Sequence, residues 1–356
     1  MLLEGIFSAI PTPFHPDGRL YLRKLEHNVD RYSRTQLAGM LVLGSDGESV
    51  MLDLEEQREV FKTAIEAASP KKGMLAGIGQ ESVLQTLRLA EYAATLRYDA
   101  VLVRAPHFYR GQLHRAHGPQ REMLTYYRVV ADQSPLPVIL SSVPDLTLYD
   151  FPVEVVAELA QHPNIIGIKD FSGRPERIAA LVKATQLRKR TVTVTPVFAP
   201  VTLRMQDGAS EGEGQNFVAA DALGKTEAAL AIVPPKTAMK TRQKEVGFAV
   251  LGGAAHTLQA SLEAGASGGV LAFAACAPQC CYEIYAAWKE GDASLAMEKQ
   301  QQLSPASLRV GGQMGISGIK YACDLSGYFG GRPRLPLLPL TAEEQQEVQS
   351  RMADIR

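Results

Sequence analysis

Cysteine is scarce in this chain of 356 residues, and the few cysteines lie in its last third. They are Cys276, Cys280, Cys281 and Cys323, and they lack the paired spacing of a zinc site. We interpret them as reduced thiols, several of them packed on a helix. The pattern predicts neither a disulfide framework nor a bound metal.

Long apolar runs and an excess of one charge are also missing. No apolar run reaches the ~20 residues that a membrane-spanning helix needs. Lys and Arg total 37 against 38 for Asp and Glu, so the chain lacks the basic footprint of a nucleic-acid binder. The N-terminus lacks the charged, apolar and small-residue regions of a signal peptide. We therefore expect a cytoplasmic protein with no nucleic-acid or membrane partner.

What the chain does have is a regular alternation of apolar runs with amphipathic stretches. This alternation predicts a parallel sheet covered by helices. Eight candidate strands, and no Gly-x-Gly-x-x-Gly after the first, favour a closed barrel over an open doubly wound sheet. The predicted fold is therefore α/β, a (β/α)8 TIM barrel. Its strands are Ile6–Pro11, Gly39–Gly44, Met74–Ile78, Ala100–Arg104, Val138–Ser141, Ile165–Lys169, Gly247–Leu251 and Gly268–Ala272. The predicted helices include Leu54–Ala68, Val83–Leu96, Glu122–Ala131, Pro152–Ala160, Pro175–Ala184 and Thr257–Ala264.

A barrel of this kind takes roughly 250 residues, so two segments are additions. We expect a barrel over residues 1–290, interrupted at about 188–244 between the sixth helix and the seventh strand. This insertion is too long for a structureless loop, and we predict a small β-containing excursion opposite the catalytic face, with disorder around Gly208–Gly214. Residues 291–356 form a predicted C-terminal helical appendage. Its helices are Ala293–Leu303, Ile316–Leu325 and Thr341–Ala353, the last starting with a capping pattern.

Two segments carry residues suited to chemistry. Lys169 ends the sixth predicted strand, and catalytic groups of such barrels lie at the carboxyl ends of the strands. Burial there lowers the pKa of a lysine, and a neutral amine attacks ketones. The alternative is an exposed lysine at a strand end. The second segment, Gly44–Glu48, reads Gly-Ser-Asp-Gly-Glu, and its backbone N–H groups suit a carboxylate; the alternative is an ordinary turn.

These two segments occur in order with further motifs along nearly the whole chain outside 188–244. Together they resemble the N-acetylneuraminate lyase and dihydrodipicolinate synthase family of class I aldolases. The supporting segments are Gly5–Phe14, Gly44–Glu48, Leu75–Gly79, Pro106–Tyr109, Val143–Pro144, Ile168–Gly173, Gly265–Gly269 and Gly315–Lys320. Three more segments resemble the 4-hydroxy-2-oxoglutarate aldolases of that family: Val130–Leu140, Leu159–Gly167 and Gly327–Gly331.

The resemblance implies a lyase that joins Lys169 to a pyruvate-type 2-keto acid as a Schiff base, without cofactor or metal. For the aldolase branch it implies cleavage of 4-hydroxy-2-oxoglutarate to pyruvate and glyoxylate. Ser45, with the backbone at Gly44 and Gly47, would hold the keto-acid carboxylate. Ser172 and Gly252 are further candidate substrate-binding residues. Tyr109 matches a tyrosine that reaches a neighbouring subunit's site, and the resemblance implies a homo-oligomer, a tetramer or a dimer.

The chain departs from the family at two catalytic positions. Members usually carry a tyrosine two residues before Val-Pro, where this chain has Ser141, a weaker acid with a shorter side chain. Asp46 stands where members have threonine or asparagine. Its carboxylate would repel a substrate carboxylate or replace the missing proton relay, and we favour the relay.

A third departure concerns specificity. Dihydrodipicolinate synthases have an arginine soon after Val-Pro, whereas Asp145–Thr147 contains none, which argues against that reaction. Arg104 would bind a second carboxylate or face solvent, and we favour solvent. His107 and His256 lie near the predicted site, but we assign neither to catalysis.

Three functions therefore stay open from the sequence. The first is the 2-keto acid lyase. The second is another family activity, including dihydrodipicolinate synthase. The third is a catalytically impaired barrel that binds keto acids without turnover, which Ser141 and Asp46 keep open.

Overall fold

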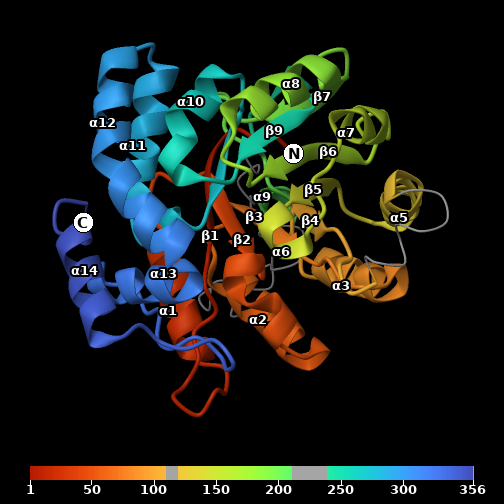
Figure 1. The fold of residues 1–356 in the computed structure, drawn as a ribbon. Helices are drawn as coiled ribbons and strands as arrows, with labels where there is room; N and C mark the ends of the chain where they lie inside the picture. The colour runs from red at the N-terminus through yellow and green to blue at the C-terminus, as the bar shows by residue number, and fades with distance from the viewer. Residues whose placement is uncertain (110–118, 211–238, 356) are drawn as a thin grey trace, which may run out of the picture.

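The computed structural model describes residues 1–109, 119–210 and 239–355 (Figure 1). Eight parallel strands close into a barrel in the order β1-β2-β3-β4-β5-β6-β9-β10, with β10 pairing back onto β1. The predicted fold class is confirmed, and each predicted strand is present within a few residues. The strands are β1 Gly5–Ala9, β2 Gly39–Val42, β3 Gly73–Gly77, β4 Ala100–Arg104, β5 Val138–Ser142, β6 Ile165–Asp170, β9 Ala249–Gly252 and β10 Gly268–Leu271.

Helices surround the barrel, as the amphipathic stretches predicted. They are α1 Leu22–Ser33, α2 Leu54–Ala67, α3 Val83–Thr95, α5 Pro119–Gln133, α6 Pro144–Thr147, α7 Val153–Leu159, α8 Pro175–Thr185, α10 Leu258–Glu263 and α11 Pro278–Lys289. Helices α1, α6 and α11 are not among the helices that the sequence patterns predicted. Helix α1 buries Leu25, Val29 and Tyr32 at helical spacing, but polar residues separate them and weaken the sequence signal.

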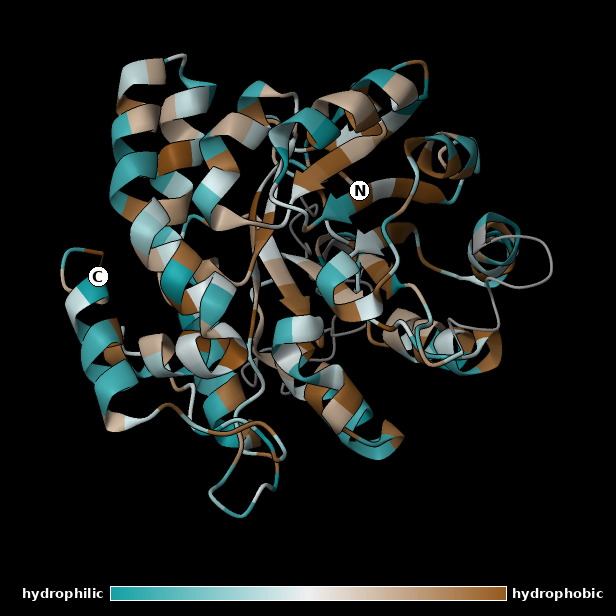
Figure 2. Ribbon diagram, viewed as in Figure 1, coloured by the Kyte–Doolittle hydropathy of each residue, from teal (hydrophilic) through white to brown (hydrophobic). Residues whose placement is uncertain are grey.

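Two layers of apolar side chains hold the barrel together. Its interior is filled by residues that point inward from the strands, including Phe7, Leu41, Leu75 and Leu251. A larger cluster lies between the outer face of the strands and the helices. Figure 2 shows the same division, with hydrophobic colour concentrated in the strands and hydrophilic colour along the outer sides of the helices. The filled interior confines any cavity to the ends of the strands.

The insertion contains an antiparallel pair of strands, β7 Lys189–Val194 and β8 Arg242–Gly247, and a helix, α9 Leu203–Ser210. The predicted β content is confirmed. Helix α9 was not predicted, and it extends through Ser210. Residues 211–214 of the segment in which we expected disorder lie outside the described part.

The insertion packs against the segments that lead into the barrel strands, so it covers the end opposite the catalytic loops, as predicted. Val192 and Val194 bury themselves against Leu2, just ahead of β1. The guanidinium of Arg204 donates hydrogen bonds to four carbonyl groups at the end of α2 and in the following turn, those of Ile65, Ala68, Ser69 and Lys72.

The C-terminal region is helical, as predicted. It consists of α12 Ala293–Ala306, a π-helical segment Ser307–Gln313, α13 Gly315–Leu325 and α14 Ala342–Met352. Thr341 and Glu344 form the expected capping box of α14. These helices lie together on one side of the barrel in Figure 1.

The cysteines are free thiols, and Cys280, Cys281 and Cys323 lie on helices α11 and α13. Within the described residues, no group of His, Cys, Asp and Glu side chains is arranged to hold a metal ion. No helix in the same residues has the length and apolarity needed to span a membrane.

Candidate active site

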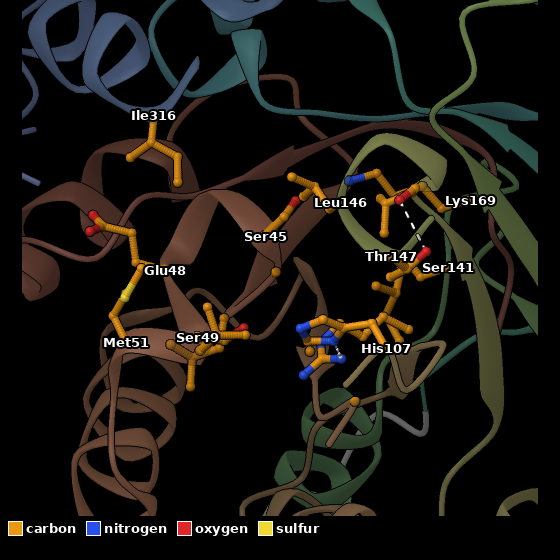
Figure 3. Close-up of a pocket in the computed structure, with 18 of the residues that line it drawn as sticks. Ser45, Glu48, Ser49, Met51, His107, Ser141, Leu146, Thr147, Lys169 and Ile316 are labelled. Carbon is orange, nitrogen blue, oxygen red and sulfur yellow. Dashed lines mark hydrogen bonds between the residues drawn. The ribbon is translucent and has the colours of Figure 1, made fainter. Parts of the chain in front are cut away.

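A cavity of about 270 Å³ lies at the carboxyl ends of the barrel strands (Figure 3). Arg104, Ser141 and Lys169 reach it from the ends of β4, β5 and β6. Its other walls are mostly apolar and are formed by Leu43, Val50, Met51, Leu102, Val143, Leu146, Ile316 and Leu337. This is the position at which barrels of this architecture place their chemistry.

Lys169 is the buried lysine of the cavity. Its residue is only 1% exposed, and the side chain points into the cavity between Ser45 and Ser141 in Figure 3. Burial lowers the pKa of the Lys169 amine, and the charge of Asp46 opposes this effect only in part. The ammonium nitrogen also lies 5.4 Å from the centre of the Phe171 ring. The predicted nucleophile is therefore placed where its neutral form is favoured.

Ser141 lies directly beside Lys169, because the two residues are register partners on β5 and β6. Ser141 is buried and lines the cavity. Thr147 lines the same wall, and its hydroxyl donates a 3.2 Å hydrogen bond to the Val143 carbonyl. Two hydroxyl groups, those of Ser141 and Thr147, therefore occupy the wall where the family resemblance implies a tyrosine.

The segment Gly44–Glu48 forms a tight 3-10 turn after β2. Its Gly47 N–H donates to the Gly44 carbonyl, and its Glu48 N–H donates to the Ser45 carbonyl, both at 3.1 Å. The N–H groups of Ser45 and Asp46 make no such bond to another described residue. Gly44 and Ser45 line the cavity. The turn thus presents unpaired donors beside a cavity-lining hydroxyl.

Asp46 and Gly47 lie just behind this surface and are not among the cavity-lining residues. The Ser45 hydroxyl donates a 3.2 Å hydrogen bond to Asp46 Oδ2. Asp46 therefore affects the cavity in two ways: it accepts the hydrogen bond from the cavity-lining Ser45, and its charge raises the pKa of Lys169 against the effect of burial.

A buried ion pair holds this turn in place, and the sequence reasoning missed it. Glu48 Oε1 lies 2.5 Å from Lys320 Nζ, and both side chains are 0% exposed. Glu48 Oε2 also accepts a 2.8 Å hydrogen bond from the Arg334 N–H. Burial lowers the pKa of Lys320 although Glu48 opposes the shift. The pair ties helix α13 to the β2 end of the site.

Arg104 does not face solvent, which corrects our expectation. Its side chain is 18% exposed and lines the cavity. Nη1 donates to Glu81 Oε1 at 3.0 Å and contacts His107 Nδ1 at 2.9 Å. His107 also lines the cavity, at some distance from Lys169 in Figure 3. Arg104, Ser141 and Lys169 are register partners on three neighbouring strands. Their side chains therefore point to the same face of the sheet, the inside of the barrel.

The remaining predicted residues lie outside this cavity. Tyr109 is 59% exposed and packs on Phe108, with ring centres 5.1 Å apart. Gly252 ends β9 as the register partner of Asp170. Ser172 donates its hydroxyl to Asp170 and lines a second cavity of about 300 Å³ together with His256. Burial lowers the pKa of His256. In this chain the Lys169 cavity thus contains neither Tyr109 nor Ser172.

Comparisons with known proteins support the fold described above. The chain is 27% identical over 354 residues to a 4-hydroxy-tetrahydrodipicolinate synthase of Acidiphilium cryptum, covering 99% of each chain. Its fold matches that of a dihydrodipicolinate synthase of Acinetobacter baumannii solved with pyruvate, with a TM-score of 0.76, 22% identity and coverage of 99% of each chain. It also matches a monomeric dihydrodipicolinate synthase variant, with a TM-score of 0.75, 21% identity and coverage of 99% of this chain and 98% of that one.

The family model described as the dihydrodipicolinate synthetase family matches residues 2–192 and 231–355. The unmatched residues between these two ranges fall inside the insertion. The matched ranges contain all the residues that form the Lys169 cavity. On this evidence the chain belongs to the dihydrodipicolinate synthetase family, whose members include synthases of the lyase class.

Proposed function

We propose that the chain is a lyase that forms a Schiff base between Lys169 and a pyruvate-type 2-keto acid. The observation that carries the proposal is the buried lysine at the end of β6, whose pKa is lowered by burial in an apolar cavity. Such an amine is neutral more often than an exposed one and is therefore a better nucleophile. The chemistry needs no cofactor, because the iminium formed on the lysine is itself the electron sink.

The preferred reaction is the cleavage of 4-hydroxy-2-oxoglutarate. Neutral Lys169 Nζ attacks C2, and loss of water gives the iminium. Removal of the C4 hydroxyl proton then breaks the C3–C4 bond, and its electron pair moves into the iminium to give an enamine. Glyoxylate leaves as the aldehyde fragment. Protonation of C3 and hydrolysis release pyruvate and restore the amine.

Ser45 and the N–H groups of the Gly44–Gly47 turn are the proposed site for the C1 carboxylate. The unpaired N–H groups of Ser45 and Asp46 support this assignment. The proton at the C4 hydroxyl would pass through the hydroxyl groups of Ser141 and Thr147, or a water held by them. Asp46 is the proposed base behind Ser45, because the two side chains are hydrogen-bonded. This arrangement would replace the tyrosine that the chain lacks.

A second candidate is the synthase reaction itself, which the name of the full-length relative favours. The cavity wall after Val143 offers Leu146 and Thr147, so the cation expected there for a semialdehyde carboxylate is missing from that wall. We therefore rank 4-hydroxy-tetrahydrodipicolinate synthase second.

We also propose that the chain assembles as a homo-oligomer, a tetramer or a dimer. Phe108 and Tyr109 lie in the loop after β4, and both aromatic side chains are exposed. Contact with a second copy of the chain would bury them. Sedimentation of the intact chain tests this. A monomer at micromolar concentration would contradict it.

The decisive experiment is reductive trapping. The protein is incubated with pyruvate and borohydride, and the adduct is located by peptide mass. We expect one adduct, at Lys169 and not at Lys320, the other deeply buried lysine. A folded protein without an adduct would overturn the Schiff-base proposal. Release of glyoxylate from 4-hydroxy-2-oxoglutarate, measured against condensation of pyruvate with aspartate semialdehyde, then separates the two reactions. An adduct with neither turnover would identify a keto-acid binder.

A further inference from the structure

The guanidinium of Arg104 is only partly used by the protein. All of its hydrogen bonds to described residues are made by Nη1, to Glu81 Oε1, His107 Nδ1 and the Ala105 carbonyl. Nε is buried and has no hydrogen-bond partner. Nη2 makes no hydrogen bond to a described residue either. Nη2 is therefore a guanidinium nitrogen that is left without an acceptor among the described residues, and a charged N–H donor of this kind binds carboxylates strongly.

Glu81 fixes Arg104 in this position. Its Oε2 accepts the N–H groups of His107 and Phe108, both at 2.9 Å, while Oε1 faces Arg104. Burial alone would raise the pKa of Glu81, but the bonds from the Phe108 N–H, Arg104 and the His107 N–H outweigh it and lower the pKa. Glu81 therefore stays ionised and orients the guanidinium, and its acceptor oxygens are already engaged. Nη2 of Arg104 therefore needs an acceptor from outside these residues.

The position of Arg104 relative to Lys169 sets the length of a substrate that could contact both residues. The two residues lie on strands separated only by β5, with Ser141 in register between them. Strand spacing of about 4.8 Å places their Cα atoms roughly 10 Å apart, and both side chains point inward. A short 2-keto acid bound to Lys169 at C2 can therefore extend its far end toward Arg104. Among the described residues lining the cavity, these are the two Lys or Arg side chains.

We propose that Arg104 is a specificity-determining residue that binds a second carboxylate, at the end of the substrate remote from the keto group. The substrates are then 2-oxo dicarboxylates, and Arg104 holds the carboxylate that leaves with the aldehyde fragment. This inference rests on the proposed Schiff base at Lys169. It also explains how the site works without an arginine after Val143–Pro144.

The test compares two five-carbon keto acids that differ at one end. 2-Oxoglutarate carries the second carboxylate, and 2-oxopentanoate ends in a methyl group. The keto-acid concentration that gives half-maximal borohydride trapping at Lys169 is measured for each compound, with pyruvate as the reference. In wild-type protein this concentration should be about 10–100-fold lower for 2-oxoglutarate than for 2-oxopentanoate, the range expected for hydrogen bonds to a charged group. Equal values would overturn the proposal without any variant.

Variants then assign the preference to Arg104. In Arg104→Met the ratio of the half-saturating concentrations of 2-oxopentanoate and 2-oxoglutarate should fall close to one. Arg104→Lys should retain part of the preference, because a lysine keeps the positive charge but not the planar guanidinium group. Arg34→Met removes an exposed arginine that directly follows α1, and this variant should keep the wild-type ratio. A preference that survives in Arg104→Met would overturn the proposal. Failure of wild-type protein to trap pyruvate would instead overturn the Schiff base, so the two proposals fail separately.

Discussion

Replacing Lys320 by methionine tests whether the buried ion pair supports the site. The ammonium lies 2.5 Å from Glu48 Oε1, and neither side chain is exposed. In Lys320→Met the carboxylate keeps the Arg334 N–H at 2.8 Å but loses its counter-charge. Breaking one side of a buried pair costs about 3–5 kcal/mol, because the remaining charge stays in a low dielectric. Urea unfolding followed by circular dichroism should show a loss of this size.

Two controls make the reasoning refutable. The double variant Glu48→Gln, Lys320→Met removes both charges and should recover most of the lost stability. Lys299→Met breaks the partly exposed pair with Glu283 and should cost no more than about 1 kcal/mol. A loss below about 1 kcal/mol in Lys320→Met, with no recovery in the double variant, would show that the pair does not stabilise the turn.

Three further predictions follow from other contacts. Lys169→Met should raise the melting temperature, because a buried ammonium is removed. The gain should be largest below the lowered pKa of Lys169 and should shrink as the pH approaches 10.5. Equal gains at pH 7 and pH 10 would contradict this prediction. Asp46→Asn should lower kcat by about 10²-fold or more while pyruvate trapping persists, and unchanged turnover would remove Asp46 from the relay. Arg204→Ala should cost about 2 kcal/mol of unfolding free energy in urea without changing turnover, and a loss of turnover in a stable variant would link the insertion to the active site.

The sequence predicted the fold because the period of its apolar residues reports local geometry directly. The eight strands and most helices could be located from alternating patterns, and Thr341 marked the start of α14 through its capping box. Helices α1, α6 and α11 were not predicted, and in α1 polar residues fill the positions between the buried ones. The Lys169, Ser141 and Ser45 positions were also predictable, since the carboxyl end of each parallel strand meets the same face of the barrel.

The environment of those residues was decided only in three dimensions. The sequence determined that a lysine lies near the end of β6. The closed barrel determined that this lysine is buried among apolar side chains and so has a lowered pKa. Glu48 and Lys320 are 272 residues apart, and no local pattern predicts that their charges meet. The inward direction of Arg104 likewise depends on its register with Ser141 and Lys169. Periodicity is set by neighbouring residues, whereas burial, charge pairing and orientation are set by segments that only folding brings together.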